Sequence, residues 1–129
     1  MRLLLDTHLL LWAVSEPARL DEATRELIED AANEVLFSAA SIWEIATKAR
    51  LGRADFAIRP EQVASAARLT GFMELPVSAD AAARVVDLPM HHRDPFDRLL
   101  VAQAMSEPAR LYTADPLLSP YSELVQLIA

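Results

Sequence analysis

Short apolar runs alternate with longer segments of helical periodicity along this chain, and this alternation restricts the possible folds more than any other feature. The runs are predicted strands at 2–6, 34–38, 73–76, 110–114 and 124–128. Strands that are separated by helical segments are typical of a parallel sheet whose strands are joined by crossover helices. The sequence therefore predicts an α/β fold.

The helices between the strands can be placed from their periodicity and their end residues. Predicted helices cover 21–32, 39–52, 60–71 and 78–88. Ser78 is a suitable N-cap and Pro60 suits the first helical position, while Gly52 and Gly71 suit helix C-termini. A phosphate-binding glycine loop needs several glycines close together. Because the chain has only these two, nucleotide-cradling functions are disfavoured.

The bulk composition bounds the class of protein. At 129 residues the chain has the size of one domain, so we expect a single domain over 1–129. It has no cysteine, which excludes disulfides and thiolate metal sites, and no apolar run of membrane length. We therefore expect a cytoplasmic protein. A formal charge of -7 with 53% hydrophobic residues predicts a soluble, acidic protein that would bind nucleic acid only through a local basic patch or bound cations.

Two aspartates lie at the ends of predicted strands. Asp6 ends the segment 2–6, and Asp115 comes after 110–114. Ligands of an open parallel sheet bind beyond the carboxyl ends of its strands, so both carboxylates are candidates for a site there. Each also has a structural interpretation, because Asp6 or the following Thr7 suits a helix N-cap and Asp115 suits a cap or turn.

Three further acids lie at or on predicted helices. Asp94 precedes Pro95 at the start of an apolar helix and is its predicted N-cap, which places Asp97 at the third helical position. Capping accounts well for Asp94 and less completely for Asp97, which should project near the strand ends. Glu44 lies in an otherwise apolar helix, where it either pairs with Lys48 at i,i+4 or faces water, a cation or a cleft.

A cluster of these carboxylates would need a counter-charge. Neighbouring carboxylates repel one another and raise their own pKa values unless a cation neutralises them. Mg2+ and Mn2+ are hard ions that prefer oxygen ligands, and a bound ion can activate a water towards a phosphate. If the fold brings the acids together, they therefore indicate a divalent-metal site.

Four stretches of the chain together resemble a known family. They are LLLDTHLLLW (3–12), SAASIWEIATKARLGR (38–53), DPFDRLLVAQA (94–104) and LYTADPLL (111–118). In this order they resemble the PIN-domain ribonucleases, specifically the VapC-type toxins of bacterial and archaeal toxin-antitoxin pairs. The resemblance extends over essentially the whole chain. It implies a PIN-like three-layer α/β/α fold with a central parallel sheet of four or five strands.

The resemblance also implies roles for individual residues. The implied ligands of one or two Mg2+ or Mn2+ ions are Asp6, Glu44, Asp97 and Asp115. Thr7 and Thr113 would orient ligands or water, and Asp94 would keep its capping role with a contact to the site. The implied reaction is endonucleolytic hydrolysis of RNA by a metal-activated water, which leaves a 5′-phosphate and a 3′-hydroxyl.

Basic residues gather in one part of the sequence. Four of them lie within 12 positions, opposed only by Asp55: Lys48, Arg50, Arg53 and Arg59. We expect Lys48, Arg50, Arg53 and Arg98 to contact RNA, although Lys48 and Arg50 also suit the last turn of a helix. The run 91–93 is a further candidate. His91 and His92 are interpreted as loop residues rather than catalytic bases, because metal activation leaves little need for a base.

The resemblance further implies protein partners. In the family an antitoxin segment packs along an apolar cleft beside the acids, and toxins commonly pair as homodimers. The apolar segment 7–14 could line such a cleft. We therefore expect a VapB-type antitoxin to bind a groove that includes Leu9, Trp12 and Trp43, and we expect a homodimer.

Two other classes of protein use similar features. A phosphoacceptor receiver domain also has strand-end acids and Mg2+, but it resembles a pattern with an acidic pair after the first strand and a lysine late in the chain. Here Asp6 is followed by Thr7, and Lys48 is the only lysine. A noncatalytic binding module with a PIN fold is disfavoured because all four acids are present.

Overall fold

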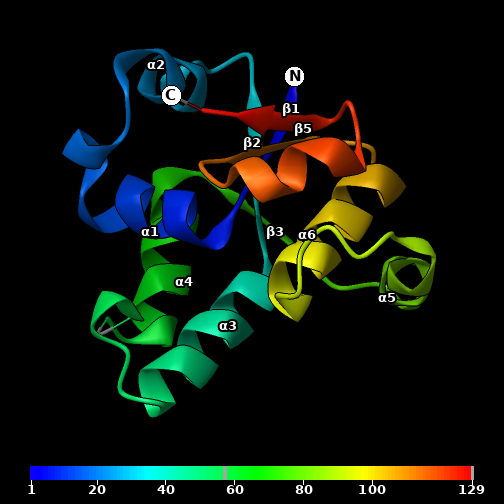
Figure 1. The fold of residues 1–129 in the computed structure, drawn as a ribbon. Helices are drawn as coiled ribbons and strands as arrows, with labels where there is room; N and C mark the ends of the chain where they lie inside the picture. Colours follow the sequence, from blue (N-terminus) through cyan, green and yellow to red (C-terminus); the bar gives the residue numbers. More distant parts are fainter. Residues whose placement is uncertain (57, 129) are drawn as a thin grey trace.

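The computed structural model describes residues 1–56 and 58–128, which fold around a parallel five-stranded sheet (Figure 1). The strands are β1 (Arg2–Leu5), β2 (Glu34–Ser38), β3 (Met73–Leu75), β4 (Arg110–Thr113) and β5 (Val125–Leu127). Their order across the sheet is β3-β2-β1-β4-β5, and every neighbouring pair is parallel. Each predicted strand is present, so the predicted α/β class and strand number are confirmed.

Six helices and four short 3-10 helices connect the strands within the described residues. The helices are α1 (Thr7–Ser15), α2 (Glu22–Glu29), α3 (Ala39–Arg50), α4 (Pro60–Thr70), α5 (Ala79–Arg84) and α6 (Pro95–Ser106). The 3-10 helices are η1 (Pro17–Arg19), η2 (Ala54–Phe56), η3 (Val85–Asp87) and η4 (Pro116–Tyr121). None of these helices is long and apolar enough to cross a membrane.

The predicted helix ends are largely confirmed. The Ser78 side chain accepts a hydrogen bond from the backbone of α5, and Gly71 ends α4 in the left-handed conformation at φ 100°. Two predicted helices are too long at their C-termini. The helix predicted at 21–32 ends at Glu29, and the one predicted at 78–88 tightens into η3 from Val85 onwards.

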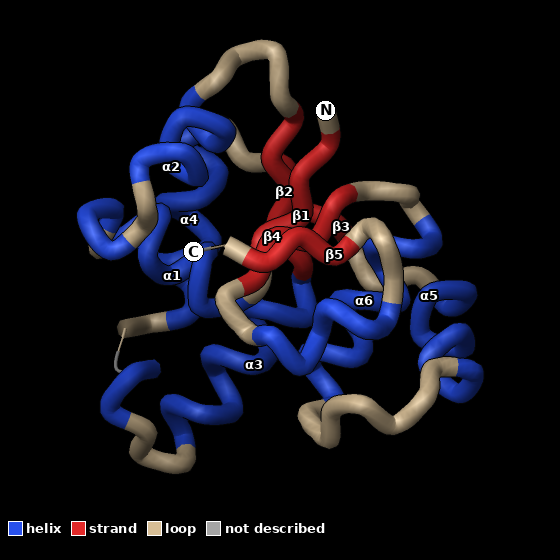
Figure 2. Tube along the Cα trace, turned by 45° about the horizontal axis from the view of Figure 1, so that its top comes forward, coloured by secondary structure: helices blue, strands red, loops and turns tan. Residues whose placement is uncertain are grey.

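Helices cover both faces of the sheet, as Figure 2 shows with α1, α2 and α4 on one side and α5 and α6 on the other. Alternate residues of β1 supply the two halves of the core because successive side chains of a strand point to opposite faces. Leu3 and Leu5 pack with α1 and α4, whereas Leu4 packs with α6. The three-layer α/β/α arrangement is therefore the one predicted.

The order of the strands fixes where a site can form. The chain passes from β1 to β2 on one side, while β4 pairs with the other side of β1. Such a reversal of strand order opens a crevice at the carboxyl ends of the two strands, where ligands of α/β proteins usually bind. Asp6 follows β1, Asp115 follows β4 by two residues, and α3 begins directly after β2.

Candidate active site

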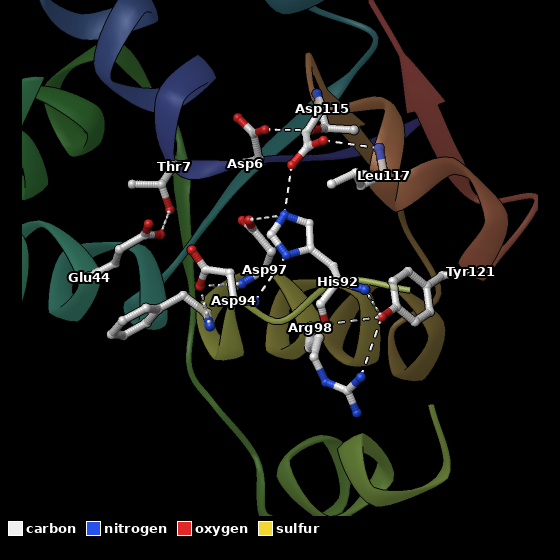
Figure 3. A network of polar contacts seen from close by, with 12 residues as sticks. Asp6, Thr7, Glu44, His92, Asp94, Asp97, Arg98, Asp115, Leu117 and Tyr121 are labelled. Atoms are coloured by element: carbon white, nitrogen blue, oxygen red, sulfur yellow. Dashed lines mark hydrogen bonds and ion pairs between the residues drawn. The ribbon is translucent and has the colours of Figure 1, made fainter. Parts of the chain in front are cut away.

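The predicted acids come from different elements and meet beyond the carboxyl ends of β1 and β4 (Figure 3). Asp97 lies in the first turn of α6, and Glu44 lies on α3. The negative charges of Asp94, Glu44 and Asp6 all act on Asp97. One carboxylate oxygen of Asp97 lies within 4.8 Å of one from Asp115. The fold thus gathers residues that are 109 positions apart in the sequence.

Three of the aspartates at this edge divide their two oxygens between a helix and the site. Oδ1 of Asp6 accepts a hydrogen bond from the Leu9 amide at 2.8 Å, and Oδ1 of Asp115 accepts one from the Leu117 amide at 2.9 Å. Oδ1 of Asp94 caps α6 in the same way. The other oxygen of each faces a neighbouring side chain. The capping and chemical interpretations of these residues are therefore compatible, and capping fixes the carboxylates in place.

A hydroxyl group orients the carboxylate of Asp6. Thr113 Oγ1 donates to Asp6 Oδ2 at 2.6 Å and accepts from the Asp115 amide at 3.0 Å, so it links the ends of β1 and β4. Asp6 is 5% exposed. Burial raises the pKa of Asp6, although the hydrogen bonds from Thr113 and the Leu9 amide oppose that increase. Thr113 thus contacts the acids, and its role in orienting ligands or water stays a prediction.

Thr7 and Lys48 both contact the Glu44 carboxylate. Thr7 Oγ1 donates to Glu44 Oε1 at 2.5 Å, and Lys48 Nζ lies 2.5 Å from Oε2. Lys48 also contacts Asp94 Oδ2 at 3.3 Å. Burial lowers the pKa of Lys48, but the hydrogen bond and charge of Glu44 and the charge of Asp94 outweigh it, so the net pKa is raised. Lys48 is thus a counter-ion of this half of the site.

Asp97 has the least compensated charge of the site. Burial, followed by repulsion from Asp94, Glu44 and Asp6, raises its pKa to about 7, while His92 opposes the increase. The only hydrogen-bonding or charged side chain that contacts its carboxylate among residues 1–56 and 58–128 is His92, with Nε2 at 3.4 Å. A buried carboxylate with this environment prefers to be protonated or to bind a cation.

His92 is the site residue that sequence reasoning missed. Its Nε2 lies 2.8 Å from Asp115 Oδ2 and 3.4 Å from Asp97 Oδ2, so it stands between the two carboxylates rather than in a solvated loop (Figure 3). Only its spacing before Asp94 could have indicated this position. That signal is weak because the loop path that carries it depends on tertiary contacts.

Two of the predicted binding residues are buried, and those predictions are wrong. Arg98 is 7% exposed, and its guanidinium donates to backbone carbonyls of the preceding loop instead of facing RNA. Leu9 is 0% exposed and packs in the core against β1, so it cannot line an antitoxin groove. In both cases the helix turns the side chain inward.

The remaining predicted binding residues lie on the surface or near it. Arg50 and Arg53 are exposed at and after the end of α3, and Trp43 is 63% exposed with its ring edge against Phe96. Trp12 lines a hollow on α1, where Arg19 stacks over its ring at 4.7 Å. Their binding roles stay predictions.

Comparisons with known proteins bear on the family of this chain. The profile of the PIN domain matches residues 3–123. The chain belongs to the PIN domain family. It is 36% identical over 117 residues to Ribonuclease VapC22 of Mycobacterium tuberculosis (strain ATCC 25618 / H37Rv), and the match covers 87% of this chain and 85% of that protein. The resemblance to VapC-type PIN domains that was predicted from sequence motifs is therefore confirmed.

A solved structure shares the architecture of this PIN domain. The crystal structure of VapBC2 from Rickettsia felis bound to a DNA fragment from their promoter contains a chain that superposes with a TM-score of 0.68. The match covers 98% of this chain and 97% of that chain, at 18% sequence identity. At an identity this low, the match shows a shared fold alone.

Proposed function

We propose that this PIN domain is a divalent-metal-dependent endoribonuclease that acts as the toxin of a VapBC-type toxin-antitoxin pair. The observation that carries the proposal is the cluster of buried and partly buried carboxylates at the strand ends, in a chain that is 36% identical to a protein named as a ribonuclease. The cluster would serve as the metal and catalytic site through Asp6, Glu44, Asp97 and Asp115.

The chemistry of the donor set fits Mg2+ or Mn2+. Its ligand atoms are carboxylate oxygens, which hard divalent ions prefer. Asp97 carries a pKa raised to about 7 through burial and the surrounding negative charges, so the site lacks positive charge at this position. Among the acids that the structure describes, Lys48 contacts Glu44 and Asp94 but not Asp97. One or two ions bound between Asp97, Asp115 and Asp6 would supply the missing charge.

The residues of the site would have separate roles in hydrolysis. A bound divalent ion would polarise the scissile phosphate and activate a water for attack on phosphorus. Asp97 and Asp115 would hold the ion, while Thr113 keeps Asp6 oriented and Thr7 keeps Glu44 oriented. The capped oxygens limit rotation of Asp6 and Asp115, so little reorganisation would accompany the reaction. Cleavage would leave a 5′-phosphate and a 3′-hydroxyl.

The same proposal includes the partners. Arg50 and Arg53, exposed beside α3, would contact the RNA backbone. A VapB-type antitoxin would bind a groove that includes Trp12 or Trp43, and the toxin would form a homodimer in the cytoplasm. If a folded Trp12→Ala variant binds its cognate antitoxin as tightly as the wild type does, Trp12 is not part of that groove.

The first test is to map new 5′ ends in cellular RNA shortly after induced expression of the wild type and of Asp97→Asn. This nearly isosteric change removes one ligand charge. We expect discrete 5′-phosphate ends with the wild type and a loss of at least about 100-fold with the variant, on the scale of losing a major electrostatic contribution to catalysis. The matched control is Asp80→Asn, which alters an exposed aspartate in the first turn of α5 and should cleave like the wild type.

The alternative function is a noncatalytic binding module with the PIN fold. It predicts matching profiles of 5′ ends for the wild type and Asp97→Asn when both proteins are folded and expressed. That result would contradict the endoribonuclease proposal. Ends that appear with the wild type but carry a 5′-hydroxyl would contradict the proposed metal-activated water.

A further inference from the structure

The inference concerns His92, whose ring lies between two carboxylates of the site and contacts the backbone on its other side (Figure 3). Nε2 lies 2.8 Å from Asp115 Oδ2. On the opposite edge of the ring, the backbone amide of Asp94 donates a hydrogen bond to Nδ1 at 2.9 Å. The side chain is 16% exposed, so water competes little for either nitrogen.

The contact with the backbone amide determines which ring nitrogen carries the proton. An amide N–H can only donate, so Nδ1 of His92 must accept and carries no hydrogen. A neutral imidazole then has its proton on Nε2. Nε2–H therefore points at Asp115 as a hydrogen-bond donor, with Asp97 Oδ2 as a more distant neighbour at 3.4 Å.

The same contact argues against His92 as a metal ligand. One atom from each of His92, Asp97 and Asp115 lies within 4.8 Å of the others, a spacing that suits a three-ligand metal site. A nitrogen must be free of hydrogen to bind a metal. Nε2 could meet that condition only if the proton moved to Nδ1, which would break the hydrogen bond from the Asp94 amide.

We propose that His92 is a positioning residue that acts through Asp115: its Nε2–H holds the Asp115 carboxylate in place for the ion without binding the ion itself. This role rests on the metal site of the proposed function. Asp115 needs such support because its side chain is 34% exposed, the most of the proposed ligands in the site. The Leu117 amide holds Oδ1 and His92 holds Oδ2, which leaves the other lone pairs of the carboxylate for a ligand.

Arg98 and Tyr121 hold His92 in position. The His92 amide donates to the Tyr121 hydroxyl at 2.9 Å, and the Arg98 guanidinium donates to the same hydroxyl at 3.3 Å. Arg98 also donates to the carbonyls of Leu88 and Pro89, which fixes the loop that leads to His92. Arg98, which was expected to contact RNA, thus stabilises the loop that carries His92.

The first experiment reads the tautomer of His92 by 15N NMR of the metal-free, full-length protein, at a pH where the imidazole is neutral. His92→Gln provides the assignment of the resonance. We expect the Nε2–H tautomer. The Nδ1–H tautomer would overturn the proposal, because Nε2 would then be an acceptor and a potential ligand.

The second experiment measures the affinity for Mn2+ by calorimetry in the wild type, His92→Ala and His92→Gln. We expect His92→Ala to bind about 10-fold more weakly, as is typical when a residue that orients a metal ligand is lost. The glutamine amide can donate in place of Nε2–H, so His92→Gln should stay within about 3-fold of the wild type. The control is Arg84→Gln, which alters an exposed residue at the end of α5 and should leave the affinity unchanged.

Each outcome decides the proposal. An alanine variant that keeps the wild-type affinity while remaining folded by circular dichroism would overturn it. So would a directly bound imidazole nitrogen seen by pulsed EPR of the Mn2+ complex. In an Asp115→Asn background, His92→Ala should have less than about a 3-fold further effect, because the two residues act as one unit. A wild type that binds no Mn2+ would contradict the proposed function, whereas the tautomer would still decide the role of the hydrogen bond.

Discussion

Asp97 and Arg98 are adjacent in the sequence, lie in the first turn of α6 and are both largely buried. Their charges nevertheless differ in how far the surrounding protein compensates them. The Arg98 guanidinium donates to the carbonyls of Val85, Leu88 and Pro89 at 3.0–3.2 Å. The Asp97 carboxylate has only His92 Nε2 as a polar side-chain contact within the described residues, at 3.4 Å, and its pKa is raised to about 7 through burial and repulsion.

The difference separates a structural charge from a functional one. A buried charge whose hydrogen bonds are all met within the protein supports the fold, and its removal leaves other groups unpaired. A buried charge without partners destabilises the free protein and increases the affinity for a counter-charge that arrives later. Neighbouring residues of one helix turn can therefore have opposite effects on stability when their charges are removed.

The largest expected effect is the loss of stability in Arg98→Met. The substitution removes the guanidinium donor from three loop carbonyls, and those of Leu88 and Pro89 lose their only hydrogen-bond donor among the described residues, whereas that of Val85 keeps the Leu88 amide. We expect the free energy of unfolding to fall by about 3–5 kcal/mol, because a buried carbonyl without a donor is costly. Urea denaturation of the metal-free protein measures this loss. Arg84→Met, at an exposed position at the end of α5, is the matched control and should change stability by less than about 0.5 kcal/mol. A loss below about 1 kcal/mol for Arg98→Met would contradict the structural role.

Asp97→Asn should have the opposite sign. The pKa of Asp97 is about 7 in the folded protein, above its ordinary value of 3.8, so the folded state binds the proton more tightly. Stability is therefore fully present below about pH 4 and is lost as the pH rises through about 7. Because Asn avoids this loss, we expect the metal-free variant to be about 2–4 kcal/mol more stable than the wild type at pH 8 and nearly equal at pH 4.

The measurement is urea denaturation of the wild type and Asp97→Asn in chelator at both pH values. Asp80→Asn, whose aspartate is exposed, should follow the wild type at each pH. If Asp97→Asn gains nothing at pH 8, the carboxylate is compensated by contacts other than the one to His92, and the comparison with Arg98 fails.

The affinity for Mn2+ should depend on pH through the same group. Below about pH 7 an ion must displace the proton of Asp97, so the affinity should rise about tenfold for each pH unit and level off above. Calorimetry from about pH 5.5 to about pH 8.5 tests this trend, and Asp97→Asn serves as the control that should lose it. A constant affinity below about pH 7 would mean that Asp97 is not a ligand.

Signals within a few residues allowed most of the fold to be predicted. Apolar runs predicted all five strands correctly. Ser78 and Asp94 begin their helices and Gly71 ends its helix as expected, because capping depends on the adjacent backbone alone. The ends of 21–32 and 78–88 were overestimated. Helical periodicity continues past the point where the backbone tightens or turns, so it cannot mark the last turn.

The surroundings of Asp97 and Arg98 on α6 show which features of the site the sequence could predict and which it could not. The acid cluster could be expected because carboxyl ends of parallel strands meet at one edge of a sheet. The environment of Arg98 and His92 depends on the path of the loop from Leu88 to Asp94, which long-range contacts with Tyr121 determine. The sequence therefore indicates that Asp97 faces the site, but it does not show that the neighbouring Arg98 faces the loop and not RNA.

The smallest expected effect on stability comes from removing an exposed ion pair between Arg68 and Glu74. The distance between its charged atoms is shorter than that of any hydrogen bond of Arg98. Arg68 Nη2 lies 2.6 Å from Glu74 Oε1, but the two side chains are 57% and 41% exposed. Water and salt screen such a pair, so Arg68→Ala should lower stability by less than about 0.5 kcal/mol. A double-mutant cycle with Glu74→Ala isolates the pair by urea denaturation. A coupling above about 1 kcal/mol would mean that distance rather than burial decides the value of a charge here, and the contrast between Asp97 and Arg98 would then need another cause.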